Sequence, residues 1–119
     1  MSRYGENMKL EVATKATKAV FKTQGKDYNV TVLNYSQPGL LKRVAKYMAS
    51  QNPDTDFSVI WFYNYRERQF DVTLTTSHRP GSTVDIIKIA KSFGGSGFKD
   101  ISRFVLSGQP GDIGKVIKL

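Results

Sequence analysis

The stretch Asp56–Ser77, DFSVIWFYNYRERQFDVTLTTS, determines what kind of fold this chain of 119 residues can form. An apolar run from Phe57 to Tyr63 is followed by a polar turn at Tyr65–Arg68 and an alternating run from Phe70 to Leu74. This order predicts a β-hairpin. Because both faces of its first arm are apolar, we expect that arm inside a sheet, with a helix layer on at least one face.

A second hairpin is predicted upstream, in ATKATKAVFKTQGKDYNVTVLNYS. Gly25 lies between two β-prone runs, which places strands near Ala19–Thr23 and Tyr28–Asn34. The first segment could instead begin as a helix, since three apolar side chains fall on one helical face, those of Ala13, Ala16 and Val20. The pattern leaves that boundary open.

Two helices are expected. The first covers Pro38–Ser50, with Ser36 as a plausible N-cap. Its apolar positions recur at helical spacing, its outer face carries Lys42, Arg43 and Lys46, and QNPD ends it. The second begins after a loop, SHRPGST, in which Ser82 or Thr83 can act as the N-cap. The glycines that follow Phe93 end this helix.

Two strand-like runs remain, at Arg103–Leu106 and, as a possible terminal strand, at Val116–Leu119. The chain therefore predicts an α/β fold in a single domain, a mixed sheet of about five strands with helices packed on it. We expect residues 1–18 to be a polar, loosely docked leader and residues 19–119 to form the domain.

Charge indicates the class of partner. Eighteen Lys and Arg against ten Asp and Glu give a formal net charge of +8, which favours anionic partners such as nucleic acid or nucleotides. Alternatively, the lysines serve solubility alone. The chain has no cysteine, no apolar run long enough to span a bilayer and no signal-peptide pattern at its start. We expect a soluble intracellular protein, cytoplasmic and not bound to a membrane.

Three glycines within four residues, in IAKSFGGSGFKDISRF (Ile89–Phe104), are the most unusual local feature. Bare peptide N–H groups at a helix end can bind a phosphate, so Gly94, Gly95 and Gly97 are candidates for an anion site. The alternative is a helix C-cap followed by a tight turn. The pattern is neither the dinucleotide fingerprint, which precedes a helix, nor a P-loop, whose spacing is missing.

From Phe21 onward the chain resembles the substrate-binding associated domain of DHH-family phosphoesterases, such as RecJ-like exonucleases and oligoribonucleases. The match is most specific in VDIIKIAKSFGGSGFKDISRFVL and extends to NYSQPGLLKRVAKYM and to the central hairpin. The matching residues are the helix start Val84 and Asp85, the pair Ile89 and Ala90, then Phe93, and the turn Gly94, Gly95, Ser96 and Gly97. The resemblance implies that this turn contacts the phosphate and terminal nucleotide of a substrate.

The chain also departs from the family pattern. Phe98 stands where the family has histidine, Thr75 and Thr76 replace an Arg-Ser pair, and Ile101–Arg103 replaces a small-residue stretch. The family's hydrolysis uses a metal centre in another domain that contains an Asp-His-His motif, and such centres need several carboxylates. This chain has no Asp-His pair, so we expect no metal, no cofactor and no catalysis by the chain alone.

The remaining candidates for a functional role are a histidine, three aspartates and a group of aromatic residues. His78, the only histidine, is expected in an exposed loop and not as a catalytic base. The aspartates next to strands and turns, Asp54, Asp56 and Asp71, are assigned no metal. The aromatic residues Trp61, Phe62, Tyr63 and Tyr65 could stack on bases. For Phe57, Ile60 and Phe62 core packing is the better interpretation, and Tyr63 and Tyr65 are expected to be more exposed.

Together these features predict a non-catalytic module that binds a nucleotide, RNA or single-stranded DNA. Lys88, Lys91, Lys99 and Arg103 bracket the glycine turn, and they either converge on a phosphate or form a solvated surface. The predicted site consists of Gly94, Gly95, Ser96, Gly97, Lys99 and Arg103. One alternative is an interaction subunit of a larger assembly such as a ribonucleoprotein or an oligomer. Another is the substrate-binding half of a divided phosphoesterase whose DHH catalytic chain is separate.

Overall fold

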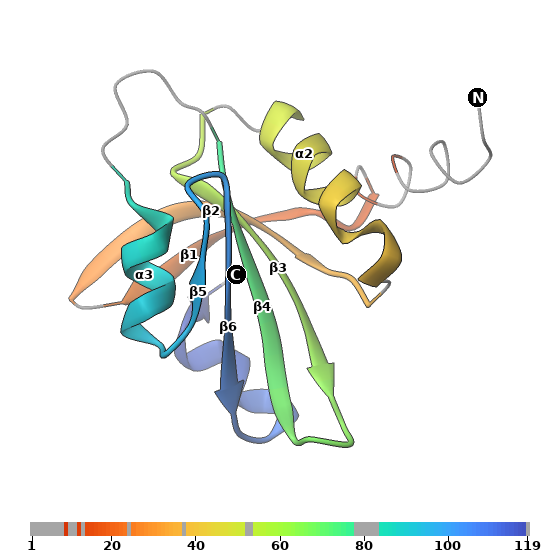
Figure 1. Ribbon diagram of the computed structural model, residues 1–119, viewed down its shortest axis with the longest axis vertical. Helices are drawn as coiled ribbons and strands as arrows, with labels where there is room; N and C mark the ends of the chain where they lie inside the picture. The colour runs from red at the N-terminus through yellow and green to blue at the C-terminus, as the bar shows by residue number, and fades with distance from the viewer. Residues whose placement is uncertain are drawn as a thin grey trace.

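A seven-stranded mixed sheet with a helix against each face makes up the computed structural model (Figure 1). The structure describes Lys9, Val12 and residues 14–23, 25–36, 38–51, 54–77 and 84–118. The strands are β1 (Thr17–Thr23), β2 (Lys26–Asn34), β3 (Phe57–Asn64), β4 (Gln69–Thr76), β5 (Ser96–Gly97), β6 (Ile101–Ser107) and β7 (Ile117–Lys118). Within the described residues the helices are α2 (Leu41–Gln51) and α3 (Ile86–Ser92), with the 3₁₀ turns η1 (Pro38–Leu40) and η2 (Pro110–Lys115).

The strand order is β5-β6-β4-β3-β2-β1-β7. Strands β2 and β3 pair in parallel, as a crossover through α2 requires, and the other neighbours pair antiparallel. The sheet is therefore mixed, as expected from the sequence.

The central hairpin is confirmed. Strands β3 and β4 pair from Phe57 opposite Thr76 to Asn64 opposite Gln69. Successive side chains of a strand point to opposite faces. Phe57 and Val59 accordingly enter the cluster that contains α3, while Ile60 enters the cluster that contains α2. The apolar character of both faces of this strand is thus explained by a helix on each side, and α2 and α3 lie well apart in Figure 1.

Aromatic rings organise the core on the α3 face. Phe21 is fully buried, and its ring lies edge-on to Phe57 at 5.5 Å, to Phe93 at 6.1 Å and to Phe104 at 6.4 Å between centroids. Phe93 and Phe104 stack at 4.4 Å. Offset and edge-on pairs stabilise beyond their buried area. The residue that ends α3 is thereby held against β6, which positions the glycine turn that follows it.

The α2 face has its own core. Val44, Ala45 and Met48 are buried at the helical spacing that the sequence indicated, and they pack over Leu33 and Ile60 of the sheet. Val12 is also buried in this cluster, and β1 begins at Thr17. Both residues lie within the stretch predicted to be a leader, most of which lies outside the described residues.

The strand count was wrong: the sheet has seven strands, where about five were predicted. Strands β5 and β7 have two residues each and lie at the edges of the sheet. Strand β5 was not predicted, because two residues are too few to show an alternating pattern. The expected terminal strand is β7.

The N-cap expected for the second helix was also wrong. The cap is Asp85, whose Oδ1 accepts from the N–H groups of Ile87 at 3.0 Å and Lys88 at 3.2 Å. An aspartate suits this position because its carboxylate satisfies donors at the first turn. Ser82 and Thr83 lie outside the described residues, as does His78. The first helix opens with the 3₁₀ turn η1, and α2 begins at Leu41.

The burial of two aromatic side chains of β3 differs from the prediction. Phe57 and Ile60 are buried as expected, but Phe62 is only half-buried. Tyr63 is half-buried as well, because it packs against the core and donates its hydroxyl to the Gly108 carbonyl at 2.7 Å. Tyr65, in the turn, is 76% exposed.

Candidate nucleotide-binding cleft

The glycine turn begins as a helix C-cap. Gly94 has a φ of 83°, a left-handed conformation that glycine adopts without strain. Its N–H donates to the Lys91 carbonyl at 3.0 Å, and the N–H of Gly95 donates to the Ala90 carbonyl at 2.8 Å. These two bonds form a Schellman motif. The amides of Gly94 and Gly95 are therefore occupied by the helix end and are not free donors for an anion.

Gly95 and Gly97 are needed for a different reason, which is close approach to β6. A Cβ on Gly95 would lie 2.6 Å from Phe104 Cβ and still closer to the Arg103 carbonyl oxygen. A Cβ on Gly97 would lie 2.7 Å from the Ile101 carbonyl oxygen. No side chain larger than hydrogen fits at these distances without movement of the backbone. The bare backbone thus lets β5 pair with β6 immediately after the helix cap.

One amide of the turn remains directed outward. The N–H of Phe98 donates to the Ile101 carbonyl at 2.7 Å. Pairs of residues in an antiparallel ladder alternate between hydrogen-bonded and non-hydrogen-bonded, so the next pair, Gly97 opposite Ser102, is of the second kind. The N–H of Gly97 therefore points away from β6, at a strand that is the edge of the sheet.

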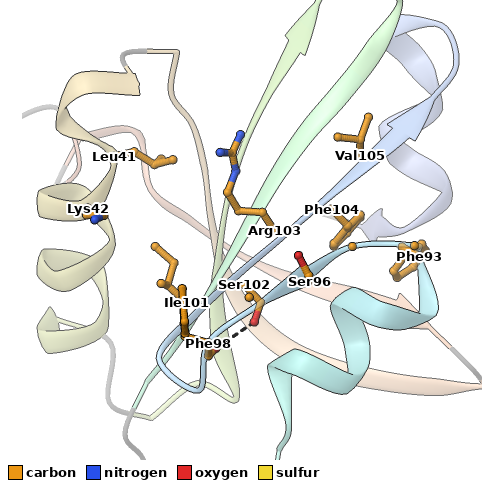
Figure 2. A pocket seen from close by; sticks show the side chains of 13 residues that line it. Leu41, Lys42, Phe93, Ser96, Phe98, Ile101, Ser102, Arg103, Phe104 and Val105 are labelled. Atoms are coloured by element: carbon orange, nitrogen blue, oxygen red, sulfur yellow. Dashed lines mark hydrogen bonds between the residues drawn. The ribbon is translucent and has the colours of Figure 1, made fainter.

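A cleft of about 680 Å³ adjoins the turn, and we call it the turn cleft. It is lined by Gly94–Gly97, by Ile101–Val105 and, from α2, by Leu41 and Lys42. Figure 2 shows Leu41 pointing from α2 toward Arg103 and Ile101 of β6. A volume of this size lies within the range of roughly 300–1,000 Å³ found for small-molecule sites.

Arg103 is the principal cation of the predicted site that lies in this cleft. It is on the α2 face of the sheet, because Ile101, two residues earlier on the same strand, packs against the α2 cluster. Its Nη2 lies 3.9 Å from Oδ1 of Asp71, with the side chains 59% and 15% exposed. The contact is long for an ion pair, and the arginine side chain is more than half exposed, so Asp71 leaves part of the guanidinium facing solvent. The guanidinium is therefore available to a second anion.

The other predicted cations do not line the turn cleft. Lys88 and Lys91 are exposed on α3, and Lys99 is exposed beyond Phe98. The full convergence considered from the sequence is not found, since among these four residues only Arg103 is in the lining. In contrast, Lys42 from α2 lines the cleft although the sequence indicated only that it was on the outer face of a helix.

Thr75, one of the departures from the family pattern, has a structural contact. Its hydroxyl is buried and donates to the Asp100 carbonyl at 3.2 Å, and the N–H of Thr76 donates to the same oxygen at 3.2 Å. These bonds attach Asp100, and with it the loop that contains Phe98 and Lys99, to the end of β4.

Acidic residues in the described part of the chain do not form a metal centre. No group of three or more His, Cys, Asp or Glu side chains able to hold a metal is found there. Asp54 accepts from Lys18 at 3.3 Å, and this hydrogen bond holds the pKa of Asp54 below its ordinary value. Asp56 accepts from the backbone N–H of Asn29 at 2.8 Å.

Within the described ranges no helix is both long enough and apolar enough to cross a lipid bilayer.

No protein-family model matches this chain, and the curated proteins contain no match. Among solved structures, the fold is similar to that of a pGpG-specific phosphodiesterase, PggH, from Vibrio cholerae, with a TM-score of 0.58 and 13% sequence identity. The match covers 95% of this chain and 36% of the phosphodiesterase chain. At such low identity the similarity shows the fold alone, an α/β domain that makes up about a third of the longer protein.

Proposed function

We propose that this chain is a nucleotide-binding or single-stranded nucleic-acid-binding module that does not catalyse hydrolysis by itself. The observation that supports it most is the turn cleft, where an exposed, side-chain-poor turn and Arg103 lie opposite Lys42 of α2. The outward N–H of Gly97 and the two cations offer donors to a phosphate. Ser96 adds a hydroxyl, and Lys99 adds charge nearby.

The resemblance in the sequence and the similarity of the fold both favour a nucleotide-related ligand. The sequence resembles the substrate-binding domain of DHH phosphoesterases, and the fold is similar to part of a phosphodiesterase specific for pGpG. Clefts with a few convergent polar groups are the usual places for ligands. Because the Gly94 and Gly95 amides cap α3, the proposal rests on Gly97 and on side chains more than on the whole glycine turn.

A titration against nucleoside monophosphates, short RNA and short single-stranded DNA, repeated at several salt concentrations, tests this function. Arg103→Gln is expected to weaken phosphate-dependent binding by about tenfold to a hundredfold, the range for a charged hydrogen bond. Lys91→Gln removes the same charge from a position outside the turn cleft and is the matched control. An equal loss in both variants would assign binding to the general basic surface, and no binding at all would refute the function.

A divided phosphoesterase is the second candidate. A single domain of a larger enzyme would match about a third of the phosphodiesterase's length, as this chain does. The isolated chain should then leave short oligonucleotides intact in Mn²⁺ or Mg²⁺, and a partner polypeptide would supply the metal site. Turnover by the purified chain alone would contradict the non-catalytic assignment.

A further inference from the structure

A second cleft, of about 400 Å³, continues from the turn cleft along α2, and we call it the helix cleft. Lys42, Phe98 and Ile101 line both. The helix cleft also contains Lys46, Thr75 and Asp100, together with small residues of α2. The two clefts are therefore adjacent, and together we call them the groove, with α2 on one side and the β5–β6 turn on the other.

An exposed aromatic ring lies where the two clefts meet. Phe98 is 77% exposed, although an apolar side chain of this size is normally buried. Its backbone is fixed on both sides, since its N–H donates to Ile101 and its carbonyl accepts from Ser102 Oγ at 3.0 Å. The close-up shows the second bond as a dashed line (Figure 2). The ring is thus presented to solvent from a hydrogen-bonded turn.

Exposed apolar surface concentrates in this groove. In the part of the chain that the structure describes, the exposed large hydrophobic residues are Tyr65, Phe98 and Val105. Phe98 and Val105 both line the turn cleft, whereas Tyr65 lies in the distant β3–β4 turn. Phe98 is hydrogen-bonded to Ile101, four residues before Val105 on β6, so the two side chains lie at different ends of the turn cleft. Phe98 is therefore the exposed aromatic ring at the end of the turn cleft that adjoins the helix cleft.

The charges along the groove are mainly positive. Lys42 and Lys46 are four residues apart on α2, so their side chains share one face of the helix. Among the described residues neither lysine has an ion-pair partner. Arg103 adds a third cation in the turn cleft, and Asp100 is the acidic residue of the helix cleft. A polyanion with apolar faces is the ligand that complements this surface.

Cations along a groove with an aromatic platform between them suit a single strand of nucleic acid. Positive charge follows the phosphates, and any base can stack on an aromatic ring. A mononucleotide would use only one of the two clefts. An oligonucleotide could place a base on Phe98 and its phosphates near Arg103 on one side and near Lys42 and Lys46 on the other.

We propose that the groove binds a single-stranded oligonucleotide of at least two nucleotides, with a base stacked on Phe98 and phosphates beside Lys42, Lys46 and Arg103. This inference rests on the proposed function and makes it more specific. It assigns a role to the phenylalanine that replaces the family's histidine. A negatively charged peptide is the alternative occupant, and an oligonucleotide that does not bind would favour it and overturn the proposal.

Fluorescence anisotropy with a labelled six-nucleotide RNA and the matching DNA tests the stacking. Phe98→Ala is expected to weaken oligonucleotide binding by about fivefold to a hundredfold, the range for loss of one stacked base. Phe98→Tyr should retain binding. Tyr65→Ala is the matched control, because Tyr65 is equally exposed, at 76%, and lies outside both clefts. Equal effects of Phe98→Ala and Tyr65→Ala would overturn the proposal.

The lysines are tested by salt dependence. Removing two phosphate contacts should lower the slope of log affinity against log salt by about 1.4, since each contact to a single strand contributes about 0.7. The Lys42→Gln/Lys46→Gln double variant should show this change. The control is the Lys88→Gln/Lys91→Gln double variant, which loses the same charge from α3. Equal slopes for the two double variants would contradict the placement of the strand along α2.

Different results would refute the proposed nucleotide site and the proposed oligonucleotide groove. If mononucleotides bind as tightly as the hexamer and only Arg103→Gln matters, the turn cleft is a nucleotide site and the extended groove is refuted. If neither mononucleotide nor hexamer binds, both proposals fall. Circular dichroism and the fluorescence of Trp61 verify that each variant is folded, which is expected because the substituted side chains are on the surface.

Discussion

Gly95→Ala is the substitution that most directly tests why the turn is rich in glycine. The new Cβ would lie 2.6 Å from Phe104 Cβ and 2.8 Å from Phe104 Cα, and nearer still to the Arg103 carbonyl oxygen. All of these atoms belong to the backbone of β6 or to the Cβ of Phe104, whose ring is stacked in the core, so none can move without disturbing the strand pairing. The turn must separate from β6 or the strand must shift.

The expected cost exceeds that of ordinary overpacking, which is about 1–3 kcal/mol. We expect about 3 kcal/mol or more, because the clash involves backbone and also strains the Schellman cap. For a domain of this size that corresponds to a fall in melting temperature of about 10 °C or more. Gly111→Ala is the control: Gly111 has no heavy atom within 4 Å of the new Cβ and should change stability little.

Urea unfolding, followed by circular dichroism and by Trp61 fluorescence, measures the difference. A Gly95→Ala midpoint close to that of Gly111→Ala would refute the close-approach explanation. Gly94→Ala should fall between them, at about 1–2 kcal/mol, because its φ of 83° is strained for alanine although the space is open. A substitution at Gly95 therefore measures folding, and binding is better tested at Arg103 and Phe98.

Three further predictions concern the N-cap of α3, the unfolding of the protein in acid and two buried hydroxyl groups. Asp85→Ala should lower the unfolding free energy by about 1 kcal/mol, while Asp85→Asn, which keeps an acceptor, should lose less; equal losses would contradict the cap. The pKa of Asp112 is held below its ordinary value of 3.8 by the N–H of Gln109, so its stabilising contribution is present above that value and lost as the pH falls through the lower folded pKa. Asp112→Asn should therefore make acid unfolding less steep, and an unchanged profile would count against this bond. The buried hydroxyls of Thr31 and Ser58 lack a hydrogen-bond partner among the described residues, so Thr31→Val and Ser58→Ala should be neutral or stabilising in urea; a loss above about 1 kcal/mol would indicate a missed partner.

The sequence predicted the elements whose signals are local. The β3–β4 hairpin follows from an apolar run, a polar turn and an alternating run, and the structure confirms it. The buried positions of α2 follow from helical spacing. The helix end at Phe93 follows from the glycines, one of which has the positive φ that a C-cap requires. Each of these signals lies within one short segment of the chain, the longest being the hairpin from Phe57 to Thr76, and depends on local backbone and side-chain preferences.

The packing of these elements against one another could not be predicted from such local signals. The two-residue strand β5 has no pattern of its own and exists because β6 is adjacent to it. Lys42 and Phe98 are 56 positions apart in the sequence. They line one groove because α2 packs on the sheet face beside the turn between β5 and β6. Lys88 and Lys91, closer to the turn in sequence, lie outside it because α3 packs on the opposite face. Local patterns specify backbone conformation, whereas a binding site depends on which faces of distant segments are buried together.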